Sequence, residues 1–317
     1  MMKVNFQKGV LRLNSVFKSE KSTMNTRSTL LLLFILFLSV RVQAQLLWKI
    51  SGNGLSENSY LFGTHHLIDK DLVPQFDSIL AVCGQTDVVV GEMDLKTPGM
   101  QKKMMKGSVM KGKTMKDLVS ASDYQLLDTE FKSVMGLGMK MLGSFKPMML
   151  MTMHEVMLYM KSSGVKKQPV AVDELFQKQA RAAKKKVIGL ETIEFQMNML
   201  FDSFTLERQV AILLYEVREK DQMVNELKQL NDVYVLGNLE KMKQMDVEDE
   251  SMTPEERRRL IDDRNMNWIK KLPTLFKERS CFVAVGCMHL VGEAGLINQL
   301  RLNGYTVEPV RFLSTIQ

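Results

Sequence analysis

The chain has 317 residues and a formal net charge of +7, with 26 methionines and only three cysteines. This length predicts one large domain or two small ones and excludes a small scaffold held together by disulfides. Residues 1–44 hold seven lysines and arginines and one acidic residue, which leaves 36 basic and 35 acidic residues in the rest of the chain. The positive charge therefore belongs mostly to the leader, and we expect no nucleic-acid partner.

The first 44 residues have the layout of a secretory signal peptide. A basic start at Met24–Arg27 precedes the apolar run Leu30–Val40, and Val42–Ala44 fits a cleavage site. The apolar run is too short for a comfortable membrane span, and the cleavage point lacks the cysteine of a lipid anchor. We predict an exported protein, periplasmic or secreted, with a mature domain at residues 45–317 and no stable membrane span.

The mature chain opens with a β-β-α-β pattern. We predict strands at 46–50, 59–62 and 87–90, with a helix at 72–82. A helical insertion rich in methionine and lysine follows at about 98–165. His154 lies in this insertion, and we interpret it as structural or surface-exposed.

A second β-α-β unit follows. We predict a strand at 169–172, a helix capped by Asp173 and a strand at 187–190, then a second helical insertion at about 193–275. Within that insertion, Thr253 and Pro254 have the pattern of a helix start. The chain closes with a strand at 281–285, a helix at 292–302 and a strand at 305–310. The whole pattern predicts an α/β protein with a central mixed sheet built from βαβ units and two large helical insertions.

The methionines and the cysteines each allow a functional and a structural interpretation. The many methionines suggest a copper site, because thioethers bind Cu(I), but they also fill irregular helix cores, which we favour. An exported protein can form a disulfide between two of Cys83, Cys281 and Cys287, yet buried free thiols are the plainer interpretation. A nucleophilic role for Cys287 stays open.

Two segments at opposite ends of the mature chain share one form. Gly63–His66 and Gly286–His289 each follow an apolar strand and each read G-x-x-H. A glycine at a strand end lets the backbone turn sharply, and a histidine three residues later lies at the carboxyl edge of the sheet, where open α/β folds build their sites. The pair predicts one site assembled from both ends of the sequence. His65 is the weaker candidate because neighbouring side chains of an extended segment point to opposite faces.

Polar residues follow four predicted strands: His66, Glu92, Glu191 and His289. Two imidazoles and a carboxylate form a common catalytic metal set, and a further carboxylate serves as a base or orients a ligand. We therefore take His66, His289 and Glu92 as candidate metal ligands and Glu92, Glu191 and Arg264 as candidate catalytic residues. Arg264 would bind a substrate carboxylate or an oxyanion. The alternatives are hydrogen-bonded structural histidines, a solvated Glu92 and a surface ion pair at Arg264.

Several of these segments resemble the TraB/PrgY/GumN family. The matching pieces are the tryptophan strand Leu47–Ile50, the motif Gly63–Leu67, Glu92–Asp94, Asp173, Gly189–Thr192 with Gln196, Arg264–Asn265, Gly286–Gly292, Gly295–Leu296 and Gly304–Val307. The resemblance covers nearly the whole mature chain. The family is similar to the Tiki proteins, described as metal-dependent proteases, which implies His66 and His289 as ligands and Glu92 as ligand or base.

We therefore hypothesise an exported metal-dependent hydrolase, a peptidase acting on a peptide or protein with Mn, Co or Zn. A metal-bound water would attack the scissile carbonyl. Because a distantly similar fold binds haem, the alternative is a non-catalytic protein that sequesters a peptide or haem. A third hypothesis is an esterase-like activity at the same site.

Overall fold

The computed structural model describes residues 46–164, 170–249 and 251–312. All of them belong to one compact unit, Gln43–Gln317, and the remaining unit, Met1–Val42, lies outside the described residues together with the predicted signal peptide. None of the helices in the described part of the chain is long and apolar enough to cross a membrane.

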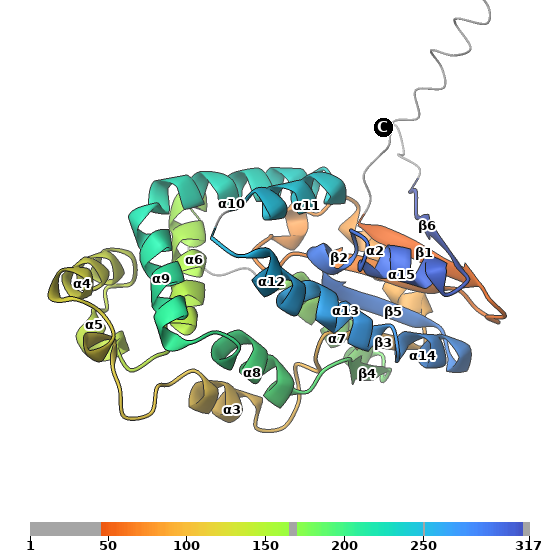
Figure 1. The fold of residues 1–317 in the computed structure, drawn as a ribbon. Coiled ribbons are helices and arrows are strands. Elements are labelled where there is room, and N and C mark those ends of the chain that lie inside the picture. Colours follow the sequence, from red (N-terminus) through yellow and green to blue (C-terminus); the bar gives the residue numbers. More distant parts are fainter. Residues whose placement is uncertain (1–45, 165–169, 250, 313–317) are drawn as a thin grey trace, which may run out of the picture. The chain divides into compact units, whose positions relative to one another are not determined.

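A six-stranded mixed sheet forms the centre of this unit (Figure 1). Its order is β4-β3-β5-β2-β1-β6, and β4, β3, β5 and β2 run parallel, whereas β1 is antiparallel to both of its neighbours. The strands are β1 (Leu47–Gly52), β2 (Ser59–Thr64), β3 (Val88–Gly91), β4 (Lys186–Gly189), β5 (Cys281–Gly286) and β6 (Tyr305–Pro309). The predicted α/β class with a central mixed sheet is confirmed.

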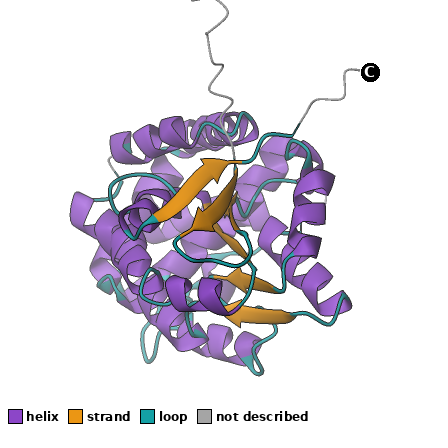
Figure 2. Ribbon diagram, turned by 90° about the vertical axis from the view of Figure 1, so that its right-hand side faces the viewer, coloured by secondary structure: helices purple, strands orange, loops and turns teal. Residues whose placement is uncertain are grey.

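The central strands β3 and β5 are apolar along their whole length and β2 is apolar in its middle, because helices enclose the sheet (Figure 2). Val89 and Val90 of β3 are completely buried, as are Phe62 of β2 and Phe282 of β5. The ring of Phe176, from helix α7 (Val172–Ala182), packs 5.2 Å from Phe62 and 4.7 Å from Phe282, measured between ring centroids. This aromatic contact fixes α7 against the parallel strands.

Two predicted elements differ from the structure. The helix predicted at 72–82 is α2 (Phe76–Gln85), preceded by a short 3-10 turn at Lys70–Leu72. Pro74 explains the delay, since the residue before a proline avoids the helical region and Val73 is extended. The strand predicted at 169–172 is wrong for its described part, because Val172 begins α7. A short apolar run does not by itself distinguish a strand from a buried helix start. Asp173 is accordingly not the cap but lies in the first helical turn.

The two helical insertions pack against each other, with α4, α6 and α9 in mutual contact on one side of the sheet (Figure 1). The first contains α3 (Met100–Gly107), the 3-10 turn η2 (Met115–Asp117), α4 (Ala121–Met135), α5 (Met139–Leu142) and α6 (Pro147–Ser163). The second contains α8 (Ile193–Asp202), α9 (Leu206–Arg218), α10 (Lys220–Val235), α11 (Leu239–Glu248), α12 (Pro254–Arg257), the π-helical turn η3 (Arg258–Asp262), α13 (Asp263–Trp268) and α14 (Leu272–Glu278). After β5 come the 3-10 turn η4 (Cys287–His289) and α15 (Leu296–Leu302).

Methionines fill the cores of these insertions. Met110, Met115 and Met139 are buried in one cluster, and Met148 and Met197 in another. The plain interpretation of the methionines therefore accounts for these positions. The helix start at Thr253 is also present, with a reciprocal capping box to Glu256 and Pro254 at the first helical position.

Candidate functional site

The four polar strand ends lie along one edge of the sheet. Because β4, β3, β5 and β2 are parallel neighbours, the residues that follow them appear there in the order Glu191, Glu92, His289, His66. The chain thus brings His66 and His289, 223 positions apart in the sequence, to the carboxyl edge, where α/β proteins form ligand sites.

The two G-x-x-H motifs are in direct contact. A Cβ atom added at Gly63 would lie 3.0 Å from both the Cα and the Cβ of Cys287 and 3.1 Å from Leu290. Only glycine lets β2 pass this closely to the turn that carries His289. This close contact brings the two G-x-x-H motifs, from opposite ends of the mature chain, to one place.

Arg264 of α13 is the centre of the network. Its Nε and Nη2 donate to the two carboxylate oxygens of Glu191, each at 2.9 Å, and Nη2 also donates to Glu92 Oε2 at 2.5 Å. Its Nη1 donates to His289 Nε2 at 3.0 Å and to the Leu260 carbonyl at 3.2 Å. All five N–H groups of the guanidinium therefore have an acceptor. Arg264 is buried, so the surface ion pair considered from sequence is wrong.

Glu191 is equally saturated. Beyond the bidentate pair with Arg264, its Oε1 accepts from Trp268 Nε1 at 2.9 Å and its Oε2 from Gln196 Nε2 at 3.0 Å. Only 5% of its side chain is exposed. Four donors on one buried carboxylate make Glu191 an anchor for the arginine.

Glu92 joins this platform to β5. Its Oε1 accepts the backbone N–H of Gly286 at 2.8 Å. Burial alone would raise its pKa, but the charges of His289 and Arg264 and the Gly286 hydrogen bond outweigh burial and lower the pKa to about 2. Glu92 is therefore ionised at neutral pH and is a weak base.

His289 is held as a neutral ring. Its Nδ1 lies 2.8 Å from Asn265 Oδ1, and the Asn265 amide nitrogen donates to the carbonyls of His289 and Ala294 at 3.1 and 3.0 Å. These contacts fix the amide and assign the proton to Nδ1, which leaves Nε2 to accept from Arg264. Burial is the main cause that lowers the pKa of His289 to about 3, and Arg264 adds to it. Since His289 is neutral above that pH, Arg264 is the partner that keeps Glu92 ionised.

His66 has a different environment. Its side chain is 64% exposed, and its Nδ1 lies 3.9 Å from Asp173 Oδ1, a buried oxygen without a hydrogen-bond partner in the described part of the chain. Asp173 raises the pKa of His66 against the opposing effect of burial. The neighbouring His65 instead packs on Tyr234 with ring centroids 5.3 Å apart, and burial is the main cause that lowers its pKa to about 4.

The predicted metal set fits a metal poorly in this arrangement. Across residues 46–164, 170–249 and 251–312, no group of three or more His, Cys, Asp or Glu side chains has the geometry to hold an ion. The Nε2 lone pair of His289 and Oε2 of Glu92, which a metal would use, both accept N–H groups of Arg264. The guanidinium of Arg264 thus supplies the positive charge that a metal ion would supply at this position.

Two hydrogen-bond donors of this network were not identified from the sequence: the indole N–H of Trp268 and the backbone N–H of Gly286. Trp268 lies one helical turn after Arg264, a spacing that places both on the same face of α13 and that was a readable signal. The cysteines are free and buried. Burial raises the pKa of Cys287 to about 12, which keeps its thiol neutral and argues against a nucleophile.

Fold and site together define an α/β protein with a histidine- and carboxylate-rich edge at the ends of its parallel strands. The chain belongs to the TraB/PrgY/gumN family, whose model matches residues 46–309. No curated protein and no solved structure gives a match.

Proposed function

We propose that this protein is an exported hydrolase that cleaves a peptide at the carboxyl edge of the sheet, with His66 as the base that activates water. The supporting observation is the contrast along that edge. His66 is exposed and Asp173 raises its pKa, whereas Glu92 and His289 are tied to Arg264 and have pKa values of about 2 and about 3. Titratable neighbours whose pKa values are driven apart are typical of acid–base sites.

In this proposal the other residues support the reaction. The carboxylate of Asp173 stabilises the protonated form of His66 through its charge, and the network of Glu92, Glu191, Arg264 and His289 forms a charged wall at the same sheet edge. Arg264 has no unused donor, so its binding of a substrate carboxylate or an oxyanion would require it to release one acceptor. The proposal gives the main proton-transfer role to His66, whereas the sequence suggested Glu92 as ligand or base.

A metal-activated water held by His66, His289 and Glu92 is a competing version of the same hydrolase. It requires Arg264 to withdraw from Glu92 and His289, since both now accept its hydrogen bonds. Titration of the chelator-treated protein with Mn, Co and Zn by calorimetry decides between the two versions. A stoichiometric site that His289→Ala removes would favour the metal.

The main test is a peptide-library cleavage assay followed by a pH profile. Asp173→Asn should move the acid limb of kcat/KM to lower pH, because the carboxylate that raises the pKa of His66 is gone. Asp77→Asn, at an exposed residue of α2, is the matched control and should leave the limb in place. An unchanged limb in Asp173→Asn would remove His66 from the base role.

Glu92→Gln tests the wall itself. The amide keeps the volume of the side chain but loses the charge that faces Arg264, so we expect hydrolysis to be lost while a thermal melt still shows a folded protein. Wild-type cleavage by this variant would show that Glu92 has no essential role. Absence of cleavage and of metal binding in the wild-type protein would favour the alternative, a protein that sequesters a peptide or haem without catalysis.

A further inference from the structure

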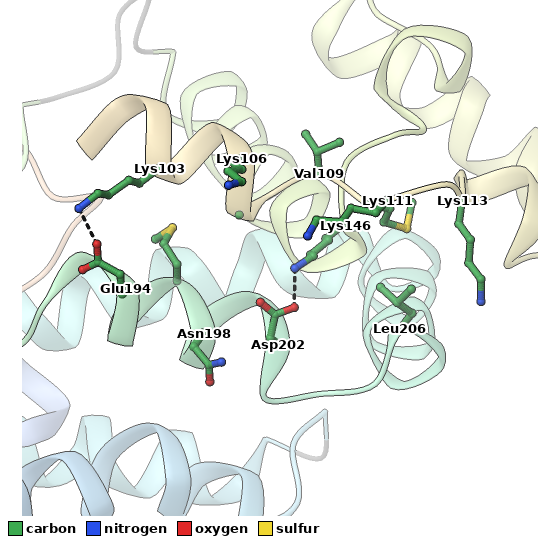
Figure 3. Close-up of a pocket in the computed structure, with 13 residues that line it drawn as sticks. Lys103, Lys106, Val109, Lys111, Lys113, Lys146, Glu194, Asn198, Asp202 and Leu206 are labelled. Atoms are coloured by element: carbon green, nitrogen blue, oxygen red, sulfur yellow. Dashed lines mark hydrogen bonds and ion pairs between the residues drawn. The ribbon is translucent and has the colours of Figure 1, made fainter. Parts of the chain in front are cut away.

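A lysine-lined groove lies between the two helical insertions, with α3 of the first and α8 of the second on its sides. It encloses about 600 Å³, within the range of ligand pockets, and five lysines surround it: Lys103, Lys106, Lys111, Lys113 and Lys146. Figure 3 shows Lys103 and Lys106 on α3 and Lys111 and Lys113 on the loop that follows, spread in a row, with Lys146 from the start of α6 drawn beside Lys111. A row of cations suits an extended anion better than a single small one.

Most of this charge is not neutralised within the protein. Lys103 pairs with Glu194 and Lys146 with Asp202, each at 2.5 Å. Lys106, Lys111 and Lys113 form no ion pair within 4.0 Å in the described part of the chain. Glu194 and Asp202 stand against five lysines in the lining, so the groove keeps an excess of positive charge. The charge of Lys113 is partly compensated, because it lies near enough to Asp117 and Glu207 to help lower the pKa of both carboxyls.

The floor of the groove is apolar. Met110 and Met197 are buried there, and a Cβ at Gly107 of α3 would be in ordinary van der Waals contact with Met197 of α8, at 3.5 Å. An apolar floor under a cationic rim fits a ligand that carries both carboxylates and apolar side chains.

The groove and the sheet-edge network share one helix. Gln196 of α8 donates to Glu191 and Glu92, at 3.0 and 3.4 Å, whereas Glu194 and Met197 of the same helix line the groove. A chain bound in the groove would therefore contact the helix whose Gln196 donates to Glu191 and Glu92 of the sheet edge.

We propose that this groove binds an acidic, partly apolar segment of a peptide, the substrate of the proposed hydrolase. The inference deepens that function and rests on it for the identity of the ligand. The lysines act as point charges toward carboxylates, and the methionine floor accepts the apolar side chains between them.

The experiment measures binding separately from cleavage. Fluorescence polarisation of the purified protein with a labelled peptide of alternating glutamate and leucine should show saturable one-to-one binding, which the matching lysine–leucine peptide lacks. Affinity should fall severalfold when salt rises from about 50 to about 300 mM, because partly exposed charges are screened.

Charge reversal locates the site. The triple variant Lys106→Glu, Lys111→Glu and Lys113→Glu should bind the acidic peptide at least roughly tenfold more weakly. The control reverses three exposed lysines of the same insertion outside the groove, Lys102, Lys140 and Lys161, and should change affinity less than about twofold. If the triple variant does not fold, Lys106→Ala with Lys111→Ala replaces it, with a smaller loss expected.

The outcomes separate the two proposals. Equal loss in both triple variants, or no binding, overturns the groove even if the protein cleaves peptides. Binding that the groove variant alone weakens, in a protein that cleaves nothing, supports the groove and counts against the hydrolase. Binding of polygalacturonate without binding of the acidic peptide would overturn the choice of a peptide.

Discussion

The molecule contains two buried histidines in charged surroundings, and they are held in opposite ways. His289 at the sheet edge contacts an amide and the guanidinium of Arg264, whereas His154 in the first insertion contacts two carboxylates. The Nδ1 of His154 lies 2.6 Å from Glu216 and its Nε2 lies 3.3 Å from Glu130, so a fully protonated ring would donate on both sides. His289 accepts a hydrogen bond where His154 is placed to donate.

The difference lies in where the fixed cation is placed. At the sheet edge Arg264 lies between two carboxylates and the histidine accepts one of its hydrogen bonds. In the insertion the imidazole lies between the two carboxylates, and the cation, Lys220, contacts Glu130 from outside at 2.6 Å. Only at the sheet edge does a second, exposed histidine lie nearby, which is why we place chemistry there.

Removal of Arg264 should have the largest effect on stability. Arg264→Ala leaves Glu92 and Glu191 buried without their shared cation, which should cost roughly 3–5 kcal/mol of unfolding free energy. Urea unfolding measures the loss. Arg258→Ala is the control on the preceding turn, because its pair with Asp263 is exposed and should contribute less than about 1 kcal/mol. Equal effects in both variants would contradict the central position of Arg264.

The insertion should be the second most sensitive region. His154→Ala creates a cavity and leaves Glu130 and Glu216 without the ring between them, which should cost roughly 2–4 kcal/mol. Because this cluster lies apart from the sheet edge, the folded fraction should keep its activity, whereas His289→Ala should lose it. Melting curves combined with activity per folded molecule test the contrast. Loss of activity in folded His154→Ala would break the division between a structural and a functional histidine.

Much of the sheet-edge arrangement was predictable because parallel strands end at a common edge. Polar residues after four apolar strands were enough to place Glu191, Glu92, His289 and His66 together. The sequence did not show that Arg264 would use every donor internally, since that depends on packing between α13 and the sheet. It also left His154 as structural or surface-exposed, because Glu130 and Glu216 come from other helices at no informative spacing. Asp173 was predicted as a helix cap, because an aspartate suits both the cap position and the first helical turn, where it lies.

The insertion cluster should also respond to pH. Burial, together with the charges of Glu216 and Asp249, raises the pKa of Glu155 to about 8, and this residue adjoins His154 in α6. The unfolded chain loses this proton near pH 4.5, whereas the folded chain keeps it to about pH 8, so stability should fall as pH rises between these values.

Glu155→Gln should flatten this slope and stabilise the protein at pH 8 by roughly 1–3 kcal/mol. Unfolding curves at several pH values measure the slope, and Glu92 does not contribute to it because its pKa lies at about 2. An unchanged slope in Glu155→Gln would place the pH sensitivity elsewhere.

The smallest effect concerns Gln196, the one uncharged donor among the described residues that contacts both Glu191 and Glu92. Gln196 Nε2 lies 3.0 Å from Glu191 and 3.4 Å from Glu92, and Arg264 still pairs with both when it is removed. Gln196→Met keeps the length of the side chain and should cost only about 1 kcal/mol, the value of one hydrogen bond. Gln196→Glu should cost more, because a third carboxylate would then face a single guanidinium. Equal losses of unfolding free energy in the two variants would show that Gln196 matters through the packing of α8. The charge balance around Arg264 would then not determine its contribution.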